Sequence, residues 1–500
     1  MAFTVQTNRT DYEYDIHSLV KAFYPQESVN VLTPDTGEGK RKELVEDLRM
    51  EVLLFRNGEG SDGAKIAFFS EDGKRTVHSF AYTGDEEDEK EFKKATKRFL
   101  YEVLTEETGR SLPWGNLTGI RPTKIAMGLL EEGSSPAQAE AFLKESHFVS
   151  GEKAALAVDI AEREKRILAD IHYENGYSLY IGIPFCPTTC LYCSFTSNPI
   201  CKWRDRVEEY IDCLIREMRF TREAFDGKIL DSVYIGGGTP TTLTAGQLDR
   251  LLTALKEIFD FSTVQEFTVE AGRADSITRE KLEILKKHKV GRISVNPQTM
   301  KEETLKLIGR QATAAQVKEA FALAREVGSF NINMDIILGL PGEDEADVQR
   351  TIAEILALKP DSLTVHSLAI KRASKLAQWI LENGISTIRN TDATMAIAAE
   401  GAAQMGMHPY YLYRQKNMSG NFENVGYATE GNYGIYNILI MEEKQTIVAL
   451  GAGSISKRVY PGGRIERSEN VKDVGLYMEK IDEMIERKRK LFEEEQLDFQ

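Results

Sequence analysis

Three of the five cysteines of the chain stand within one eight-residue loop, Cys186-Pro-Thr-Thr-Cys190-Leu-Tyr-Cys193, directly after an apolar segment typical of a β-strand. The C-x₃-C-x₂-C spacing places three thiolates close together. Three thiolates can bind three corners of a cubane [4Fe–4S] cluster, which usually takes four ligands. The fourth iron then stays open to an outside ligand, as a catalytic metal requires and a structural one does not.

Two other interpretations of these cysteines are a zinc site and three unrelated buried thiols. A zinc site needs a fourth Cys or His nearby, and residues 194–200 contain neither. Cys201 follows eight residues after Cys193, which is too far for a tight knuckle but does not exclude a looser site. Three unrelated buried cysteines are disfavoured, because so few cysteines occur in the rest of the chain.

Length and charge limit the class of protein. A chain of 500 residues predicts two to four domains. The formal net charge of −15 gives no overall field that would attract nucleic acid, so we expect no nucleic-acid partner. No apolar run approaches the ~18 residues of a membrane span, and no export signal is visible at the N-terminus. The cysteine usage fits a reducing compartment, so a cytoplasmic protein without stable membrane insertion is expected.

The middle of the chain alternates between strand-like and helix-like segments, which predicts a parallel sheet covered by helices. The predicted strands are 179–185, 232–236, 266–270, 292–295, 333–338 and 362–368. The predicted helices are 206–225, 247–259, 279–287, 314–327 and 344–358. Six such units make about three-quarters of a TIM barrel, whose site lies at the carboxyl ends of the strands. A flat doubly wound sheet is not excluded by the pattern.

Three of the predicted strands carry residues suited to binding a ligand. One ends in Gly236-Gly-Gly-Thr-Pro240, where backbone without Cβ atoms can approach a ligand closely and free N–H groups suit a carboxylate. Glu270 closes the next strand, and a carboxylate inside a barrel needs a cationic partner. Asp335 lies in the middle of an apolar strand, where an unpaired carboxylate is costly. We interpret His366, on the last strand, as a hydrogen-bonded core histidine.

The cysteine loop resembles that of radical S-adenosylmethionine (SAM) enzymes. Its flanks are similar to the coproporphyrinogen III dehydrogenase branch, and more closely to the HemZ-type proteins. The resemblance covers residues 178–460 and implies that a [4Fe–4S] cluster on Cys186, Cys190 and Cys193 binds the amino and carboxylate groups of SAM. One electron from the cluster then cleaves SAM and leaves a 5′-deoxyadenosyl radical. It also favours an open barrel over a flat sheet.

The same resemblance implies roles for individual residues. Gly237, Gly238 and Thr239 correspond to the element that holds the SAM amino group, and Arg310 to an arginine that pairs with the SAM carboxylate, a geometry that suits Arg. The further implied SAM contacts are Tyr180, Tyr192, Glu270, Gln298, Asp335, Ala369 and Ile455. The sequence identifies no residue as catalytic in its own right.

The predicted fold class is α/β: a partial (β/α)₆ radical SAM barrel with an N-terminal α+β domain and a C-terminal α+β extension. The predicted segments are an α+β domain at 1–110, a helical connector at 111–175, the barrel at 176–375 and a substrate-side region at 376–500. In the first segment, strands at 50–56, 65–70 and 76–82 precede a helix at 85–108. The loop 112–124 is interpreted either as a lid over an anionic substrate or as a linker with one packed tryptophan.

The resemblance implies a radical SAM oxidoreductase that converts coproporphyrinogen III to protoporphyrinogen IX without oxygen, supplied by an electron donor such as flavodoxin or ferredoxin. Two positions depart from the decarboxylating branch, because Phe195 replaces a further cysteine and Gly182 a histidine. Phe195 is similar to the haem-chaperone branch, yet no histidine follows His408 for the haem element of that branch. A haem-binding or haem-delivery protein, and a radical SAM enzyme acting on haem or another tetrapyrrole, are therefore the alternatives.

A tetrapyrrole substrate carries several carboxylates, and an acidic chain must meet them with a local group of cations. The candidates are Arg414 and Lys416 in an aromatic-rich segment, with Lys371 and Arg372 after the last predicted strand. Cys201 and Cys213 are expected to be dispensable, and Cys213 to be a buried free thiol in a helix.

Overall fold

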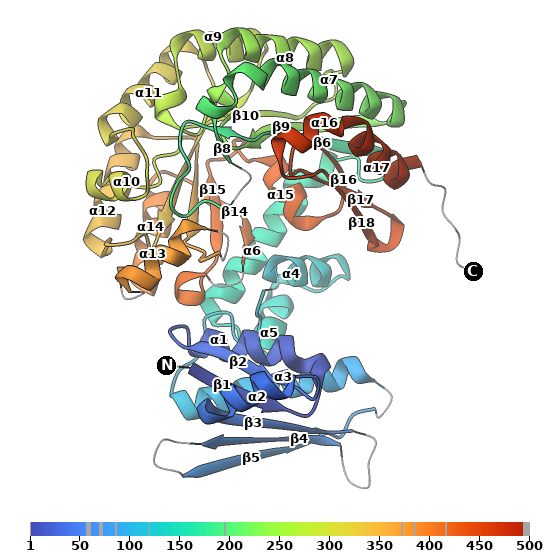
Figure 1. Ribbon diagram of the computed structural model, residues 1–500, viewed down its shortest axis with the longest axis vertical. Helices are drawn as coiled ribbons and strands as arrows, with labels where there is room; N and C mark the ends of the chain where they lie inside the picture. Colours follow the sequence, from blue (N-terminus) through green and yellow to red (C-terminus); the bar gives the residue numbers. More distant parts are fainter. Residues whose placement is uncertain are drawn as a thin grey trace. The chain divides into compact units, whose positions relative to one another are not determined.

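The computed structural model describes residues 2–56, 62–69, 74–85, 88–119, 121–194, 197–371, 374–384, 387–415 and 418–493 (Figure 1). The chain forms two compact units, which are described separately. One consists of residues 1–159 with 414–423, and the other of residues 160–413 with 424–500. Within the described ranges, no helix combines the length and the apolar character needed to cross a membrane.

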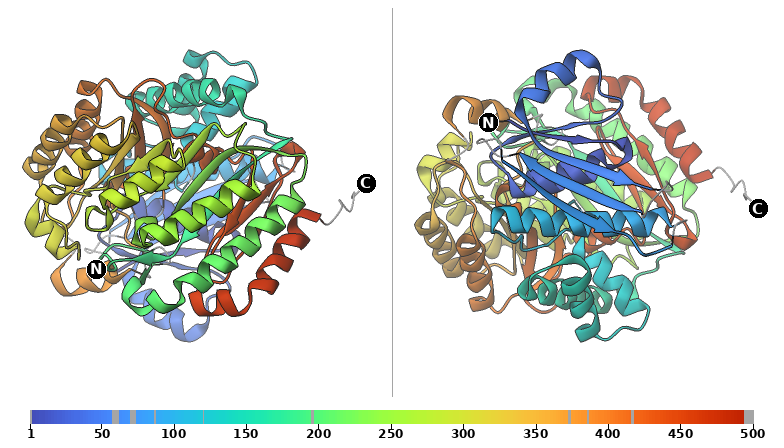
Figure 2. Two further views of the ribbon diagram at one scale, coloured as in Figure 1. Left: turned by 90° about the horizontal axis from the view of Figure 1, so that it is seen from above. Right: turned by 90° about the horizontal axis from the view of Figure 1, so that it is seen from below.

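The larger unit contains six parallel strands that pair in the order in which they occur in the chain. They are β6 (Gly176–Ile183), β9 (Ile229–Gly237), β10 (Glu266–Glu270), β11 (Arg292–Ser294), β12 (Asn331–Leu338) and β13 (Ser362–Ser367). The helices that follow the first five strands lie outside the sheet (Figures 1 and 2). They are α7 (Val207–Ala224), α8 (Ala245–Ile258), α9 (Arg279–Lys287), α10 (Glu302–Leu307), α11 (Ala314–Val327) and α12 (Glu345–Leu358). The predicted α/β fold with a partial (β/α)₆ barrel is confirmed.

Local sequence explains where several of these helices begin. Thr244, Thr313 and Asp344 each accept a hydrogen bond from the backbone N–H three residues later, and the side chain at that later position bonds back to the cap. Such capping boxes satisfy two of the N–H groups that a helix start leaves unpaired. Each box therefore fixes the residue at which a covering helix begins.

The C-terminal region extends the barrel sheet at both edges. Beside β13 lie the antiparallel strands β15 (Asn424–Ala428) and β14 (His408–Tyr413). Beside β6 lies the parallel strand β16 (Thr446–Leu450), followed by β17 (Ile455–Val459) and β18 (Ile465–Glu469). The helices of this region are α13 (Lys375–Asn383), α14 (Asp392–Gln404), α15 (Ile435–Glu442), α16 (Val474–Glu479) and α17 (Ile481–Glu493).

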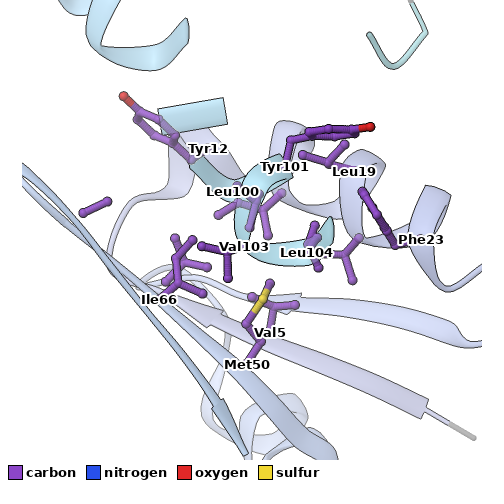
Figure 3. Close-up of a cluster of buried hydrophobic side chains, with 14 of the residues drawn as sticks. Val5, Tyr12, Leu19, Phe23, Met50, Ile66, Leu100, Tyr101, Val103 and Leu104 are labelled. Carbon is purple, nitrogen blue, oxygen red and sulfur yellow. The ribbon is translucent and has the colours of Figure 1, made fainter. Parts of the chain in front are cut away.

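The N-terminal unit is built on a five-stranded sheet in the order β2-β1-β3-β4-β5. The strands are β1 (Ala2–Thr7), β2 (Ser28–Leu32), β3 (Leu48–Phe55), β4 (Gly63–Phe69) and β5 (Arg75–Ala81). Side chains from α1 (Glu13–Phe23) and α3 (Glu89–Thr108) pack with those of the strands in one hydrophobic core (Figure 3). The last three strands and α3 match the predicted segments, whereas β1, α1 and β2 were not predicted.

The connector contains α4 (Pro122–Glu131), α5 (Pro136–His147) and α6 (Gly151–Ile167), which runs from the N-terminal unit into the larger one. Trp114 in the loop before α4 is fully buried, and its Nε1 donates to Glu423 Oε2 over 2.7 Å. Lys153 Nζ lies 2.8 Å from the other oxygen of the same carboxylate. These contacts agree with a linker that packs its tryptophan, and residues 414–423 complete the N-terminal unit.

Candidate cluster and nucleoside site

The cysteine loop follows β6 at the carboxyl end of the barrel strands. Cys186 ends the short strand β7 (Phe185–Cys186), which pairs with β8 (Asn198–Pro199). Cys186 and Cys190 are buried, and Cys193 is half-buried. Among the residues that the structure describes, no three Cys, His, Asp or Glu side chains gather tightly enough to bind one metal ion. A cubane does not require this, because each thiolate binds a different iron.

Polar groups from two neighbouring strand ends reach the cysteine sulfurs. Thr239 Oγ1 lies 3.5 Å from Cys186 Sγ, and Arg273 Nη1 lies 3.9 Å from Cys190 Sγ. Burial raises the pKa of the Cys186 thiol to about 11, and the other two cysteines add to this effect, while the bond from Thr239 opposes it. A metal that binds here must therefore displace a proton, and its own positive charge provides the driving force.

The loop is held in place by the turn that carries Arg310. Leu191 N donates to Ile308 O over 3.0 Å, and Thr188 Oγ1 donates to Gly309 O over 2.9 Å. Arg310 itself donates through Nη2 to the hydroxyl of Tyr192, 3.3 Å away. Cysteine loop and arginine turn are thus one hydrogen-bonded assembly, although more than a hundred residues separate them in the chain.

The glycine turn after β9 packs directly on the backbone before Cys186. Gly238 N donates to Ile183 O and Thr239 N to Phe185 O, each over 2.7 Å. A Cβ on Gly238 would lie 2.6 Å from Phe185 O, so only glycine permits this approach. The prediction that the N–H groups of this turn are free for a carboxylate is wrong, since they serve the protein itself. A ligand amino group would instead meet carbonyl oxygens here.

Glu270 at the end of β10 is half-buried and points toward β9. Tyr234 OH donates to Glu270 Oε1 over 2.6 Å. Burial raises the pKa of Glu270 to about 7, and the charge of Asp335 adds to the rise, while hydrogen bonds from Tyr234 and from the N–H of Gly237 oppose it. This carboxyl group is consequently poised between its two charge states near neutral pH, and a cationic ligand would favour the ionised one.

Asp335 on β12 is held in the opposite way. Burial alone would raise the pKa of Asp335, but His366, the amide of Asn333 and Thr364 outweigh this effect and lower it. Asn333 Nδ2 donates to Asp335 Oδ1 over 2.6 Å, and His366 Nε2 lies 3.9 Å from Oδ2. His366 Nδ1 in turn lies 3.3 Å from Tyr413 OH. Asp335 is therefore an ionised carboxylate at the same end of the barrel.

Three buried polar atoms at this end have no hydrogen-bond partner within the described structure: Asn296 Oδ1, Gln298 Oε1 and Arg310 Nε. Arg310 otherwise donates to Asn296 O, and Gln298 adopts a left-handed backbone with φ +66°. An unpaired buried polar group costs about 1–3 kcal/mol. Several such groups in one place suit a ligand that carries both donors and acceptors, and SAM carries an amino group, a carboxylate and a ribose.

The remaining predicted contacts are distributed around this end. Tyr180 on β6 stacks with Tyr234, their ring centroids 6.2 Å apart. Ala369 is half-buried just after β13. Ile455 is the first residue of β17, 40% exposed, and β16 separates its strand from β6. The hydrogen bonds described above thus connect Tyr192, the glycine turn, Glu270, Arg310 and Asp335 to the barrel end. Gln298 joins them because its backbone N donates to Asp335 O over 2.9 Å, whereas Ile455 lies beyond the adjoining strand.

The four predicted substrate cations have different surroundings. Arg414 lies in the N-terminal unit, where its guanidinium donates to the carbonyl oxygens of Leu117 and Asn421 and lies over the ring of Trp114. This geometry contradicts its prediction as a substrate cation, because its charge serves the packing of that unit. Lys416 and Arg372 fall outside the described residues. Lys371 is half-buried, and burial lowers the pKa of its ammonium group.

Several residues of this site were not predicted from the sequence. Tyr234, Arg273, Asn296 and the Tyr413 hydroxyl reach it from different strand ends, and no motif marks them. The alternation of β-strand side chains places Tyr234 on the same face of β9 as Gly236, which is the one signal that was available. Cys213 is a buried free thiol, as predicted, and Cys201 is exposed.

A six-stranded parallel barrel with three cysteines after its first strand defines the class of protein. Residues 180–355 match the family model "Radical SAM superfamily". The structure of coproporphyrinogen III oxidase (HemN) from Escherichia coli, described as a radical SAM enzyme, superposes with a TM-score of 0.50 at 22% identity, over 64% of this chain and 72% of that one. This likeness supports the fold.

The curated relatives narrow the family further. The chain is 40% identical over 431 residues to the "oxygen-independent coproporphyrinogen-III oxidase-like protein HemZ" of Bacillus subtilis, covering 84% of this chain and 86% of that protein. It belongs to the coproporphyrinogen III oxidase-like family of radical SAM proteins, in its HemZ-type branch. The "heme chaperone HemW" of Lactococcus lactis is 37% identical over 194 residues, 39% of this chain and 49% of that protein.

Proposed function

We propose that this protein is a radical SAM oxidoreductase that decarboxylates coproporphyrinogen III oxidatively to protoporphyrinogen IX without oxygen. The observation that carries the proposal is the set of unpaired buried polar atoms beside three cysteines at one end of the barrel. Family membership supports the class of chemistry, and the relative HemZ bears a coproporphyrinogen-III oxidase-like name.

Cys186, Cys190 and Cys193 would hold a [4Fe–4S] cluster, with Thr239 and Arg273 donating toward its thiolates. When bound, this cluster and SAM supply a 5′-deoxyadenosyl radical that can abstract a hydrogen atom from a propionate side chain. The protein binds the SAM carboxylate through Arg310 and offers the carboxylate of Glu270 to its amino group. Gln298 and Asp335 accept hydrogen bonds from the hydroxyl groups of a nucleoside. Tyr180 and Tyr192 pack around this nucleoside.

Substrate binding requires cations beyond the SAM site. Lys371, which follows β13, has the surroundings that this role needs within the described chain, because it is half-buried at the carboxyl end of the barrel. A propionate carboxylate would restore the charged form that burial disfavours. The reaction also needs a one-electron donor such as flavodoxin or ferredoxin for SAM cleavage, an acceptor for the electron that the substrate radical releases as it loses CO₂, and a reducing compartment such as the cytoplasm.

The test is anaerobic incubation of the reconstituted protein with coproporphyrinogen III, SAM and a reductant, followed by mass spectrometry. Successive formation of mono- and divinyl products supports the proposal. Cleavage of SAM without change in the porphyrinogen would contradict it. Lys371→Gln should raise the KM for coproporphyrinogen III and leave uncoupled SAM cleavage unchanged, with the exposed Lys306→Gln as the matched control.

A haem-binding or haem-delivery protein is the second candidate, because the relatives include "heme chaperone HemW" at 37% identity. This alternative predicts stoichiometric haem retention without turnover. Titration of the reconstituted protein with haem, followed by gel filtration, separates the two. A radical SAM enzyme acting on haem itself would instead consume the bound haem when SAM and reductant are added.

A further inference from the structure

Tyr234 has a position that neither the predicted motif nor the proposed function assigns. It lies on β9, two residues before Gly236, and its hydroxyl donates to Glu270 Oε1 over 2.6 Å. A Cβ on Gly236 would lie 3.0 Å from Glu270 Cδ, so the absence of a side chain there leaves room for this carboxyl group. The N–H of Gly237 bonds to the same carboxyl group. Three consecutive features of β9 are thus directed at one side chain.

The ring of Tyr234 packs against two other tyrosine rings, whose centroids lie 6.0 Å from each other. It stacks with Tyr436 of α15, centroids 4.5 Å apart and planes 23° apart, and with Tyr180 of β6 at 6.2 Å. Parallel aromatic contacts of this kind hold a ring in one orientation. The hydroxyl is therefore presented to Glu270 by a rigid support, before any ligand arrives.

The titratable groups that face Glu270 come from four elements. They are Tyr180 on β6, Tyr234 on β9, Asp335 on β12 and Tyr436 on α15. Asp335 disfavours a second negative charge, whereas a donated hydrogen bond favours it. Of the three tyrosines, Tyr234 is the one whose hydroxyl donates to the carboxylate.

We propose that Tyr234 is a positioning residue that keeps Glu270 ionised and oriented for the amino group of SAM. The inference rests on the proposed SAM site. Removing the hydroxyl takes away a donor to the carboxylate form, so Glu270 takes up a proton at higher pH than before. Above that pH the carboxylate is restored, and with it an acceptor for the N–H groups of the SAM amino group.

The primary experiment measures the SAM dissociation constant of the cluster-loaded full chain by equilibrium dialysis between pH 6.5 and 9. For Tyr234→Phe we expect about fivefold weaker binding near pH 7 for the first unit by which the pKa of Glu270 rises above about 7, and about tenfold for each further unit, with recovery toward the wild-type value at pH 9. Tyr436→Phe keeps the stacked rings and should follow the wild-type pH profile. In a Glu270→Gln background, Tyr234→Phe should have no additional effect.

Two outcomes would overturn the role of Tyr234: an unchanged SAM affinity at every pH, or a loss that is equal at every pH and so reflects shape alone. A second measurement does not depend on SAM. Infrared difference spectra of the SAM-free chain, wild type against Glu270→Gln, follow the titration of this carboxyl group, which should move to higher pH in Tyr234→Phe. If the titration moves but wild type binds no SAM, the proposed SAM site fails while the Tyr234–Glu270 coupling stands.

Discussion

The two ends of the barrel contain similar polar side chains in opposite states. At the amino ends of the strands, Arg292 donates to Asn331, Asn333 and Ser362, and to a backbone carbonyl at Asn432. Glu266 nearby accepts from two N–H groups at the start of α15. At the carboxyl ends, Arg310, Asn296 and Gln298 each keep a buried atom without a partner.

This difference separates structure from function within one sheet. A buried guanidinium whose donors are bonded within the chain stabilises the barrel and needs nothing from outside. A similar group with an unused donor is poised for a ligand. A polar cavity of about 690 Å³ also opens at the amino ends, lined among others by Arg325 and Asp361, but these two charges pair with each other over 2.8 Å. Partnering, more than the presence of a cavity, indicates which end binds.

The largest expected effect is on stability and concerns the amino ends of the barrel strands. Arg292→Met removes the buried positive charge that faces Glu266 and a donor to two asparagine side chains, so the free energy of unfolding should fall by about 3–5 kcal/mol. Urea unfolding followed by circular dichroism measures this. Arg310→Met is the matched control and should lose much less stability. Equal losses in the two variants would erase the distinction between the two ends.

The next largest effect is on SAM binding and concerns the carboxyl ends of the barrel strands. Arg310→Ala should weaken SAM binding by about 1.5–3 kcal/mol, the range for a hydrogen bond to a charged group, and leave the iron content unchanged. Equilibrium dialysis and iron analysis of the reconstituted protein give both values. Lys306→Ala, at an exposed cation in the last turn of α10, four residues before Arg310, is the control. A SAM affinity that survives the loss of Arg310 would move the ligand elsewhere.

A third place in the larger unit shows that an unfavourable buried polar group need not mark a ligand. Glu164 on α6 meets Glu442 on α15, and both are almost fully buried. Burial and the neighbouring carboxyl raise the pKa of Glu164 well above its ordinary value. Such a group favours unfolding once the pH exceeds its unfolded pKa of about 4.3, because the unfolded chain then releases the proton that the fold retains.

Glu164→Gln should therefore raise the free energy of unfolding by about 1–3 kcal/mol at pH 8, and change it little at pH 4. Thermal unfolding at the two pH values tests the sign. A destabilised variant at pH 8 would mean that the ionised carboxylate has a cationic partner. The SAM affinity should not change.

The smallest effect tests the backbone of Gln298, whose φ of +66° disfavours any side chain. Gln298→Gly should be more stable than Gln298→Ala by about 1 kcal/mol, because glycine accepts this conformation without strain. Both variants should weaken SAM binding alike, since both lose the amide. Equal stabilities in chemical denaturation would show that the left-handed conformation is relaxed in the variants.

The sequence predicted the barrel well because each βα unit carries its own local signals. The bounds of α9 and α11 agree with the predicted ones to the residue. It did not predict β16–β18 or the pairing of β15 with β13, because edge strands are defined by partners that lie far away in the chain. The prediction that Arg414 binds substrate failed for a related reason. Its charge and the neighbouring aromatic residues do not reveal that residues 414–423 belong to the N-terminal unit.

The cysteine loop illustrates both sides of this limit. Its spacing is local, and the sequence identified it directly. The donors toward its sulfurs, Thr239 and Arg273, come from other strands and become neighbours only when the sheet forms. The contact of Tyr234 with Glu270 could not be predicted for the same reason. It forms only when β9 and β10 pair in the sheet.

The position of Glu423 in the chain affects how the N-terminal unit folds during translation. Trp114 and Lys153 are translated early, yet the carboxylate that they share is added only after the six barrel strands, β6 to β13, have been synthesised. Until residue 423 has been synthesised, Trp114 and Lys153 therefore lack the carboxylate that both contact in the folded N-terminal unit. A fragment that ends at residue 159 therefore lacks residues 414–423, which belong to the N-terminal unit. That unit can be completed only late in translation.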